Sequence, residues 1–578
     1  MFRSLLVAAA AIALLAPAAS AADTPDAEIF ATDNTALITD PDDPRLDDPL
    51  TEFARAVDRI VDRGGGEPRG SELLDGVFFS SDLGGTTFER SRRFDVDRVS
   101  DSELHAIADR VRRRFLQQSV LTFDHLRRRD RDVDAILLEV PGVSAQALRD
   151  GLIADPEAQE RLFGGSVTLD GRLLLVAALE DAGLARAFAE RIGGDLGRSR
   201  TSFGEREFVE GGSPVRIEDG TLLIEGGPGD DRLEIEPDGD RIEIELGHER
   251  FEARLDAFQR IRAELGGGAD SVEIGDLRDG FGEEVRLDLG AADGRADRVA
   301  VAGSRDDDQT SVLAFGASVA VLGPAFVAID GAEPGDRLHV GGGDGDDILS
   351  ASTAAMRMTL DGGRGSDVLL GSPGDDLLIG GDDFDDVKGG RGDDVASLGG
   401  DFDRFSWAPG DGSDSVDGGA SRDSLFFRGT DAPEAFGVQA DGRRVRFTRD
   451  ADGVALELSD LEEIDTLAGG GADTVAIDDL TGTPVELVDV SLANAFSAPG
   501  GDGQPDRVAV TGTPRDDRLT LTGRVVVAGT ATLTGLGARV NVSHAEGAAD
   551  TLAIDTRGGN DTVDTSAFDP ATIGLAVD

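Results

Sequence analysis

The 578-residue sequence contains no cysteine and no tyrosine, a single tryptophan and three methionines. Without cysteine, disulfide bonds, thiolate metal sites and a cysteine nucleophile are all excluded. Arginine is plentiful, whereas Lys388 is the only lysine, a bias that suits either a GC-rich coding sequence or a salt-adapted acidic surface. A carbohydrate-binding site in the β-rich parts is disfavoured, because such sites rely on aromatic platforms and the chain, without tyrosine, has Trp407 as its single tryptophan.

Positive charge is scarce as well. Lysine and arginine total 56 against 114 aspartates and glutamates, for a net charge of −58, and the acidic residues are spread along the whole chain. Nucleic acids and anionic membranes would be repelled, so the balance favours cations as partners. Glycine is abundant at 78 residues while proline stays at 21, which argues against a Pro/Gly-rich disordered chain and for glycine at fixed structural positions.

Residues 1–21 have the pattern of a secretory signal. Arg3 supplies the basic region, Leu5 to Leu15 the apolar stretch, and the small residues 19–21 a cleavage site. The apolar stretch is too short to span a bilayer, and no later segment resembles a membrane helix. We therefore expect a secreted protein, extracellular or on the cell surface, without a membrane span.

The next two segments differ in pattern. Residues 22–49 are polar and rich in Asp and Pro, which predicts a linker. Residues 50–200 show mixed helical and strand periodicity and are predicted to form an α+β domain of unknown function. Its clearest signal is a capping box from Ser100 to Glu103, which begins a helix. A strand over residues 133–140 is expected to end at Pro141.

From about residue 214 the period becomes strand-like, and glycine-led Asp-x-apolar units recur. We predict an all-β repeat region in three parts: degenerate β repeats at 214–340, a regular tract at 341–426, and further degenerate repeats at 427–578. For isolated units such as Asn560-Asp561, an ordinary β-turn without metal is an equally good interpretation.

The regular tract repeats the nine-residue unit Gly-Gly-x-Gly-x-Asp-x-U-x, where U is a large apolar residue. One copy begins at Gly342, and further copies follow in strict phase from Gly362, Gly371, Gly380 and Gly389. Residues 398–406 form a weaker copy. After a slip of two residues the pattern resumes with Asp414 and Asp423.

Each position has a physical reason. Glycine permits a tight turn and close backbone approach, and the x-U-x half is a short strand that points one side chain inward. Two units make one coil, so Asp367, Asp385 and Asp403 should share one edge, and Asp376 and Asp394 the other. The residues expected in the narrow core are Leu369, Leu378, Val387 and Ala396.

Carboxylates that are held one strand spacing apart, about 4.7–4.9 Å, repel one another unless a cation lies between them. Ca²⁺ suits such a gap, because it accepts six to eight oxygen ligands in flexible geometry, whereas Mg²⁺ demands a tight octahedron. The residues predicted to form the calcium sites are the turn aspartates Asp347, Asp367, Asp376, Asp385, Asp394, Asp403, Asp414 and Asp423, with the loop glycines Gly362, Gly363, Gly365, Gly371, Gly374, Gly380, Gly381, Gly389, Gly390 and Gly392.

The tract resembles the RTX, or haemolysin-type calcium-binding, repeat family, most closely from Gly342 to Ser397. The resemblance implies a right-handed parallel β-roll with Ca²⁺ in every turn, which is unfolded without calcium and folds after export. Three residues depart from the family pattern: Asp383 replaces a fourth-position glycine, Ser372 a second-position glycine, and Ala396 is a small core residue.

The sequence thus predicts a multidomain, secreted calcium-binding protein with a structural or surface-adhesive role and an unidentified partner on the cell surface or in the extracellular matrix. The alternative is a secreted hydrolase with its active site in residues 50–200 and the β-roll as a folding aid. No His-Glu-x-x-His or Gly-x-Ser-x-Gly motif supports it. An acid–base pair from Asp124 and His125 is conceivable, but a surface histidine explains His125 better. We therefore do not expect an enzyme.

Overall fold

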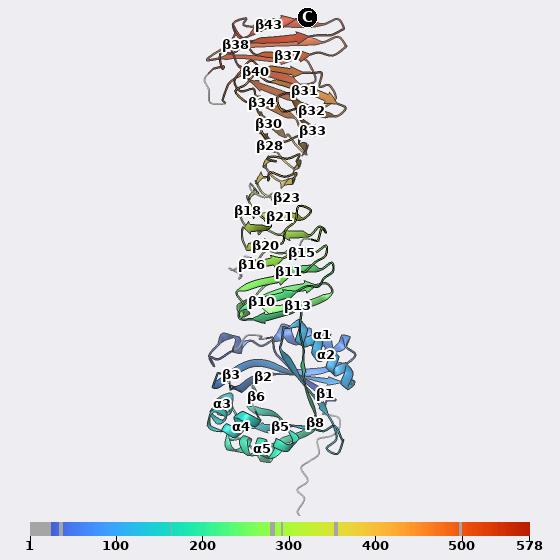
Figure 1. Ribbon diagram of the computed structural model, residues 1–578, viewed down its shortest axis with the longest axis vertical. Helices are drawn as coiled ribbons and strands as arrows, with labels where there is room; N and C mark the ends of the chain where they lie inside the picture. The colour runs from blue at the N-terminus through green and yellow to red at the C-terminus, as the bar shows by residue number, and fades with distance from the viewer. Residues whose placement is uncertain are drawn as a thin grey trace, which may run out of the picture. The chain divides into compact units, whose positions relative to one another are not determined.

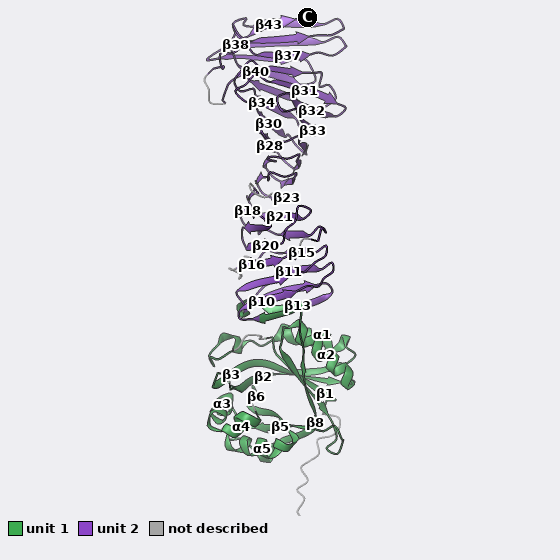
Figure 2. Cartoon of the chain, viewed as in Figure 1, with its two compact units in different colours: residues 1–217, 251–257 green, residues 218–250, 258–578 purple. Residues whose placement is uncertain are grey.

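A computed structural model describes residues 25–33, 38–81, 83–162, 164–277, 284–290, 293–351, 357–495 and 500–578. The segment predicted as a secretory signal lies outside these ranges. The chain divides into two compact units, residues 1–217 with 251–257 and residues 218–250 with 258–578 (Figure 2).

The first unit is an antiparallel β-barrel with a few helices. Its eight strands follow the order β1-β3-β2-β6-β7-β5-β8-β4, and the barrel closes because β1 pairs with both β3 and β4. The strands are β1 (Ala27–Ala31), β2 (Glu67–Ser80), β3 (Gly85–Asp97), β4 (Ser119–His125), β5 (Ala135–Pro141), β6 (Gly164–Thr168), β7 (Arg172–Ala178) and β8 (Arg200–Glu210). The helices are η1 (Pro44–Asp47), α1 (Thr51–Arg63), α2 (Asp101–Arg114), α3 (Ala145–Ala154), α4 (Pro156–Arg161), η2 (Leu179–Asp181), α5 (Ala182–Arg191) and η3 (Leu196–Arg198).

Helices cover the barrel in two groups (Figure 1). Helices α1 and α2 share an apolar core with β1 and β3, whereas α3, α4 and α5 pack on β5, β6 and β7. The predicted capping box is confirmed at the start of α2, where Ser100 N–H donates to the Glu103 carboxylate at 2.9 Å. The prediction of a linker at 22–49 is wrong for residues 27–31. Strand β1 completes the barrel, and its Ala27 and Ile29 are fully buried.

Most of the second unit lies in two large, mostly parallel sheets, here called sheet 1 and sheet 2; residues 215–217 and 251–254 of these sheets, and the turn at 255–257, belong to the first unit. Sheet 1 comprises β9 (Val215–Glu218), β10 (Thr221–Glu225), β14 (Arg260–Glu264), β16 (Glu284–Asp288), β18 (Gln309–Phe315), β19 (Ser318–Leu322), β20 (Phe326–Asp330), β22 (Ile348–Ser350), β24 (Val368–Leu370), β26 (Asp386–Lys388), β28 (Arg404–Trp407), β30 (Ser424–Arg428), β34 (Glu463–Leu467), β36 (Leu487–Ser491), β38 (Arg518–Val525), β39 (Gly529–Thr534), β40 (Arg539–Ala545) and β42 (Thr562–Phe568).

Sheet 2 alternates with sheet 1 along most of the chain. It comprises β11 (Arg232–Asp238), β12 (Arg241–Leu246), β13 (Glu249–Arg254), β15 (Ser271–Ile274), β17 (Arg298–Val301), β21 (Arg337–Asp344), β23 (Arg357–Arg364), β25 (Leu377–Asp382), β27 (Val395–Gly399), β29 (Ser415–Gly419), β31 (Ala435–Asp441), β32 (Arg444–Arg449), β33 (Val454–Ser459), β35 (Thr474–Ile477), β37 (Arg507–Thr511), β41 (Thr551–Asp555) and β43 (Gly574–Val577). A further 3₁₀ turn, η4, spans Leu255–Ala257.

In the nine-residue tract each coil contributes one short strand to each sheet. The parallel register stacks Leu369 on Val387 in sheet 1 and Leu378 on Ala396 in sheet 2. All four side chains are buried, which confirms the predicted narrow core. This part of the unit is therefore a two-sheeted parallel solenoid of the kind that the nine-residue period predicts.

The flanking repeats contain antiparallel excursions that the sequence analysis did not resolve. In each, three consecutive strands form a meander inside one sheet: β11-β12-β13, β18-β19-β20, β31-β32-β33 and β38-β39-β40. The outer strands still pair in parallel with neighbouring coils, as β18 does with β22 and β20 with β16. The meanders thus widen the sheets without interrupting the stack of coils (Figure 1).

Among the described residues, no helix is both long and apolar enough to span a bilayer.

A candidate metal site along the turns of the solenoid

The turn aspartates form ladders that run from coil to coil. One carboxylate oxygen, Oδ1, accepts the backbone N–H of the turn aspartate in the preceding coil in every predicted ligand except Asp376, whose Oδ1 accepts the Met358 N–H at 3.1 Å. Asp385 accepts from Asp367 at 2.9 Å, and Asp403 accepts from Asp385 at 2.8 Å. On the other edge, Asp394 accepts from Asp376 at 2.8 Å. The predicted division of the tract into two edges is therefore confirmed.

The remaining aspartates that were predicted as ligands join the same ladders. Asp367 accepts from Asp347, and Asp423 accepts from Asp403, which extends the first edge in both directions. Asp414 accepts from Asp394 on the second edge. Because each carboxylate is tied to the backbone by Oδ1, the position of its second oxygen is fixed.

That second oxygen, Oδ2, is buried and has no hydrogen-bond partner in most of these turns. The unpartnered Oδ2 atoms in the tract belong to Asp347, Asp367, Asp385, Asp394, Asp403, Asp414 and Asp423. Each of these residues is at most 2% exposed. A buried carboxylate oxygen without a partner is costly, so the arrangement needs a proton or a cation to be stable.

Backbone oxygens gather beside these carboxylates because the loop residues are glycine. A Cβ atom on Gly362 would lie 2.2 Å from Asp367 Oδ2 and 2.6 Å from the Gly380 carbonyl oxygen. One residue later, a Cβ atom on Gly363 would lie 2.2 Å from the Gly343 carbonyl oxygen. Glycine thus allows carbonyl and carboxylate oxygens to crowd into a space that a larger residue would fill.

The electrostatics of the ladders follow from this crowding. Burial, reinforced by neighbouring carboxylates, raises the pKa of Asp385 and of Asp394 to about 8. The same causes raise the pKa of Asp367 and of Asp423 to about 7. Backbone N–H donors act in the opposite direction but are outweighed. Without a cation, these groups would hold protons near neutral pH.

The donor set fits a hard cation that accepts backbone oxygen. Among the described residues, no three His, Asp or Glu side chains converge closely enough to hold a metal by themselves. A cation at a turn would therefore need glycine-loop carbonyls together with the unpartnered Oδ2. Ca²⁺ accepts such mixed carboxylate and carbonyl ligands, whereas Zn²⁺ prefers nitrogen and sulfur.

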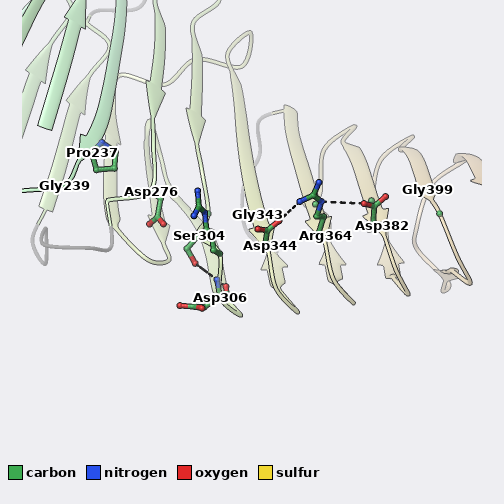
Figure 3. Close-up of a pocket in the computed structure, with 15 residues that line it drawn as sticks. Pro237, Gly239, Asp276, Ser304, Asp306, Gly343, Asp344, Arg364, Asp382 and Gly399 are labelled. Carbon is green, nitrogen blue, oxygen red and sulfur yellow. Dashed lines mark hydrogen bonds and ion pairs between the residues drawn. The ribbon is translucent and has the colours of Figure 1, made fainter. Parts of the chain in front are cut away.

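A groove of about 1330 Å³ gives solvent access to the glycine loops (Figure 3). Its wall includes the second-position glycines Gly343, Gly363, Gly381 and Gly399. Arg364 lies across it, with guanidinium nitrogens 3.5 Å from an Asp344 oxygen and 3.8 Å from an Asp382 oxygen, so the acidic wall is only partly neutralised.

Three turns differ from the expectation. Asp376 was predicted as a ligand, but its Oδ2 accepts the Ser372 N–H at 2.5 Å and is already satisfied. Conversely, Asp270 and Asp473 carry a buried, unpartnered Oδ2 although they lie in the flanking repeats and were not predicted. The signal that could have identified them is the triple glycine that precedes each, at 266–268 and 469–471.

The charged groups of the barrel do not form the pair that was considered for an enzyme. His125 Nε2 lies 3.0 Å from a Glu28 oxygen, and neighbouring residues of a strand such as Asp124 and His125 point to opposite faces. Arg93 lies 3.7 Å from Glu28. A cavity of about 600 Å³ in this unit is lined by Glu89, whose pKa burial raises to about 7, but not by Glu28 or His125.

Trp407 is buried and cannot be a surface platform for a sugar. It is 1% exposed, its ring stacks on Phe427 at a centroid distance of 4.3 Å, and its indole N–H donates to the Gly412 carbonyl oxygen at 2.9 Å. Comparison of the chain with known proteins finds no family model that matches it and no significant match among curated proteins.

Proposed function

We propose that this protein is a secreted calcium-binding protein whose solenoid depends on Ca²⁺ for folding and has a structural or surface-adhesive role. The observation that carries the proposal is the row of buried Oδ2 atoms without partners in the nine-residue tract. Supporting it are the carbonyl oxygens that crowd the same loops, the net charge of −58, and the resemblance of the repeat to RTX sequences.

The energetics favour a switch between loosely folded and folded states. A site that is filled at ten times its dissociation constant contributes about 1.4 kcal/mol, from RT ln(1 + [L]/Kd). Several such sites rival the whole stability of a typical domain, about 5–15 kcal/mol. In the absence of calcium, the same carboxylates oppose folding, because their charge must be buried or neutralised by protons.

A structural role suits the second unit better than catalysis. Its acidic loops line an open groove, and its aromatic residues Trp407 and Phe427 are buried in the core. In the barrel, the His125 side chain is paired with Glu28 away from the cavity that Glu89 lines, so no observation favours the alternative of a hydrolase.

The proposal is tested by circular dichroism of the full chain during titration from EGTA into millimolar calcium. We expect a gain of β-sheet signal that saturates with calcium and reverses on chelation, while the barrel contributes a constant background. Magnesium at equal concentration should give little gain, because it loses water reluctantly. An unchanged spectrum across the calcium titration would overturn the proposal.

A further inference from the structure

Most turns of the solenoid fall into two kinds, which differ in what the second carboxylate oxygen contacts; Asp336, whose Oδ2 accepts the N–H of Glu333 three positions earlier, belongs to neither. In the open turns Oδ2 is buried and unpartnered, as described above. In the closed turns the second carboxylate oxygen, Oδ2 of an aspartate or Oε2 of Glu434, accepts the backbone N–H of the residue four positions earlier. The closed turns pair Asp231 with Gly227, Asp308 with Ser304, Asp376 with Ser372, Glu434 with Thr430, Asp517 with Thr513 and Asp550 with Glu546, at 2.5–2.8 Å.

The residue four positions before the acid separates the two kinds. In every open turn it is a glycine with positive φ: Gly266, Gly343, Gly363, Gly381, Gly390, Gly399, Gly410, Gly419 and Gly469, with φ between 91° and 129°. None of the six closed turns has positive φ at this position, Gly227 included. A left-handed residue does not present its N–H to the carboxylate, and glycine is the residue that adopts this conformation without strain.

Asp270 and Asp473 belong to the open kind even though they lie in the flanking repeats. Their Oδ1 atoms accept the N–H of Asp231 and of Glu434, both at 2.8 Å and both from 39 residues earlier in the chain. Asp347, at the start of the regular tract, accepts from Asp308 across the same 39 residues. The three turns are therefore equivalent members of one module: a closed turn, a meander and then an open turn.

The loops at Asp270 and Asp473 also share a second carboxylate. Asp293 accepts the Gly268 N–H at 2.9 Å, and Asp502 accepts the Gly471 N–H at 2.7 Å. Each comes from the next coil along the edge and lies over the triple-glycine loop. A cation at either loop would thus meet one buried, unpartnered carboxylate oxygen and additional negative charge from its neighbour.

We propose that the residue four positions before the turn acid decides whether a turn binds a cation, so that Ca²⁺ sites exist outside the regular tract at Asp270 and Asp473, while the Asp376 turn inside it binds none. This inference rests on the proposed function and specifies where its sites lie. Three of the four meanders, β11–β13, β18–β20 and β31–β33, are then followed by a calcium-filled turn, whereas β38–β40 leads to Asp561, which is not among the buried carboxylates. In a closed turn a hydrogen bond takes the place of the ion.

The test compares Asp→Asn variants of the full chain, because asparagine keeps an oxygen that can accept the ladder N–H. Asp270→Asn and Asp473→Asn remove an open turn each; Asp231→Asn and Asp376→Asn alter closed turns and serve as matched controls. Bound calcium is counted by equilibrium dialysis with radioactive calcium. Thermal unfolding of each variant is followed in EGTA and in saturating calcium.

We expect Asp270→Asn and Asp473→Asn each to lose one bound calcium per chain and to unfold at a higher temperature than the parent in EGTA. The controls should keep the parental count and lose stability equally in both conditions, because an Asn amide cannot accept the N–H that closes the turn. If the parent binds calcium but Asp270→Asn and Asp473→Asn bind as many calcium ions as the parent, the sites proposed at Asp270 and Asp473 are ruled out while the proposed calcium-binding function stands. If the parent binds no calcium, the proposed function fails with it.

Discussion

Replacing Asp385 by Asn isolates the cost of one open turn. Burial raises the pKa of Asp385 to about 8 from an ordinary value of 3.8. Near pH 7 the unfolded carboxylate is ionised while the folded one holds a proton, which at about 1.36 kcal/mol per pH unit costs about 4 kcal/mol. The Asn amide leaves a buried donor in its place, at about 2 kcal/mol. We therefore expect Asp385→Asn to stabilise the calcium-free chain by about 2 kcal/mol.

Calcium should reverse the ranking. The parent gains about 1.4 kcal/mol from this site at ten times the dissociation constant, which offsets most of the variant's advantage of about 2 kcal/mol, and about 2.7 kcal/mol at one hundred times, which exceeds it; the variant gains nothing from the site. Urea unfolding followed by circular dichroism measures the free energy of unfolding of the parent and of the variant, in EGTA and in saturating calcium. Asp376→Asn is the control, because its turn is closed by Ser372. Equal destabilisation of Asp385→Asn in both conditions would show instead that Asp385 acts only as a hydrogen-bond acceptor and binds no calcium.

Three further perturbations test other parts of the account. In EGTA the thermal unfolding midpoint should fall as the pH rises from about 4 to about 8. The folded chain holds protons on Asp367, with a pKa of about 7, and on Asp394, with a pKa of about 8, so their stabilising contribution is complete below the ordinary pKa of 3.8 and is lost as the pH rises through the raised values. Saturating calcium should flatten this pH profile. Gly362→Ala places a Cβ atom 2.2 Å from Asp367 Oδ2 and should cost about 1–3 kcal/mol together with one calcium site, measured by calorimetry. Arg93→Ala removes the cation that lies 2.8 Å from Glu72 and leaves Arg172, at 3.4 Å, as the remaining partner of that carboxylate, so it should destabilise the barrel by about 1–3 kcal/mol without changing the number of bound calcium ions.

Each of these has its own contrary result. A calcium-free midpoint that rises with pH would show that the ladders carry no buried charge cost. Gly229→Ala is the control for the glycine variant, since no atom lies within 4 Å of its Cβ position, and equal losses at both glycines would remove the close-contact argument. A calcium count that changes with Arg93→Ala would mean that the barrel takes part in binding.

The regular tract was predictable because its signal is local and periodic. The nine-residue phase fixed which aspartates share an edge, and the ladder from Asp367 to Asp403 has the predicted order. The barrel could not be predicted from the sequence, because its closure depends on the long-range pairing of β1 with β4, which no short sequence pattern encodes. Residues 27–31 lie in a stretch, 22–49, that is polar overall, yet Ala27 and Ile29 are buried in the barrel.

The distinction between open and closed turns needed atomic geometry. Asp376 and Asp385 occupy the same position of the repeat, and only the N–H of Ser372 separates their chemistry. The open turns at Asp270 and Asp473 could not be predicted because a meander places 39 residues between ladder partners. The nine-residue period is therefore absent from the sequence there, although the turn geometry is the same.

Titration calorimetry of the full chain with calcium shows whether the buried turn aspartates hold metal. We expect binding of several calcium ions, coupled to a gain of β-structure and abolished by EGTA, with a count that falls by one in Asp385→Asn. A chain that takes up no calcium while its solenoid is fully folded would contradict the account, because protons or water would then have to satisfy the buried aspartates.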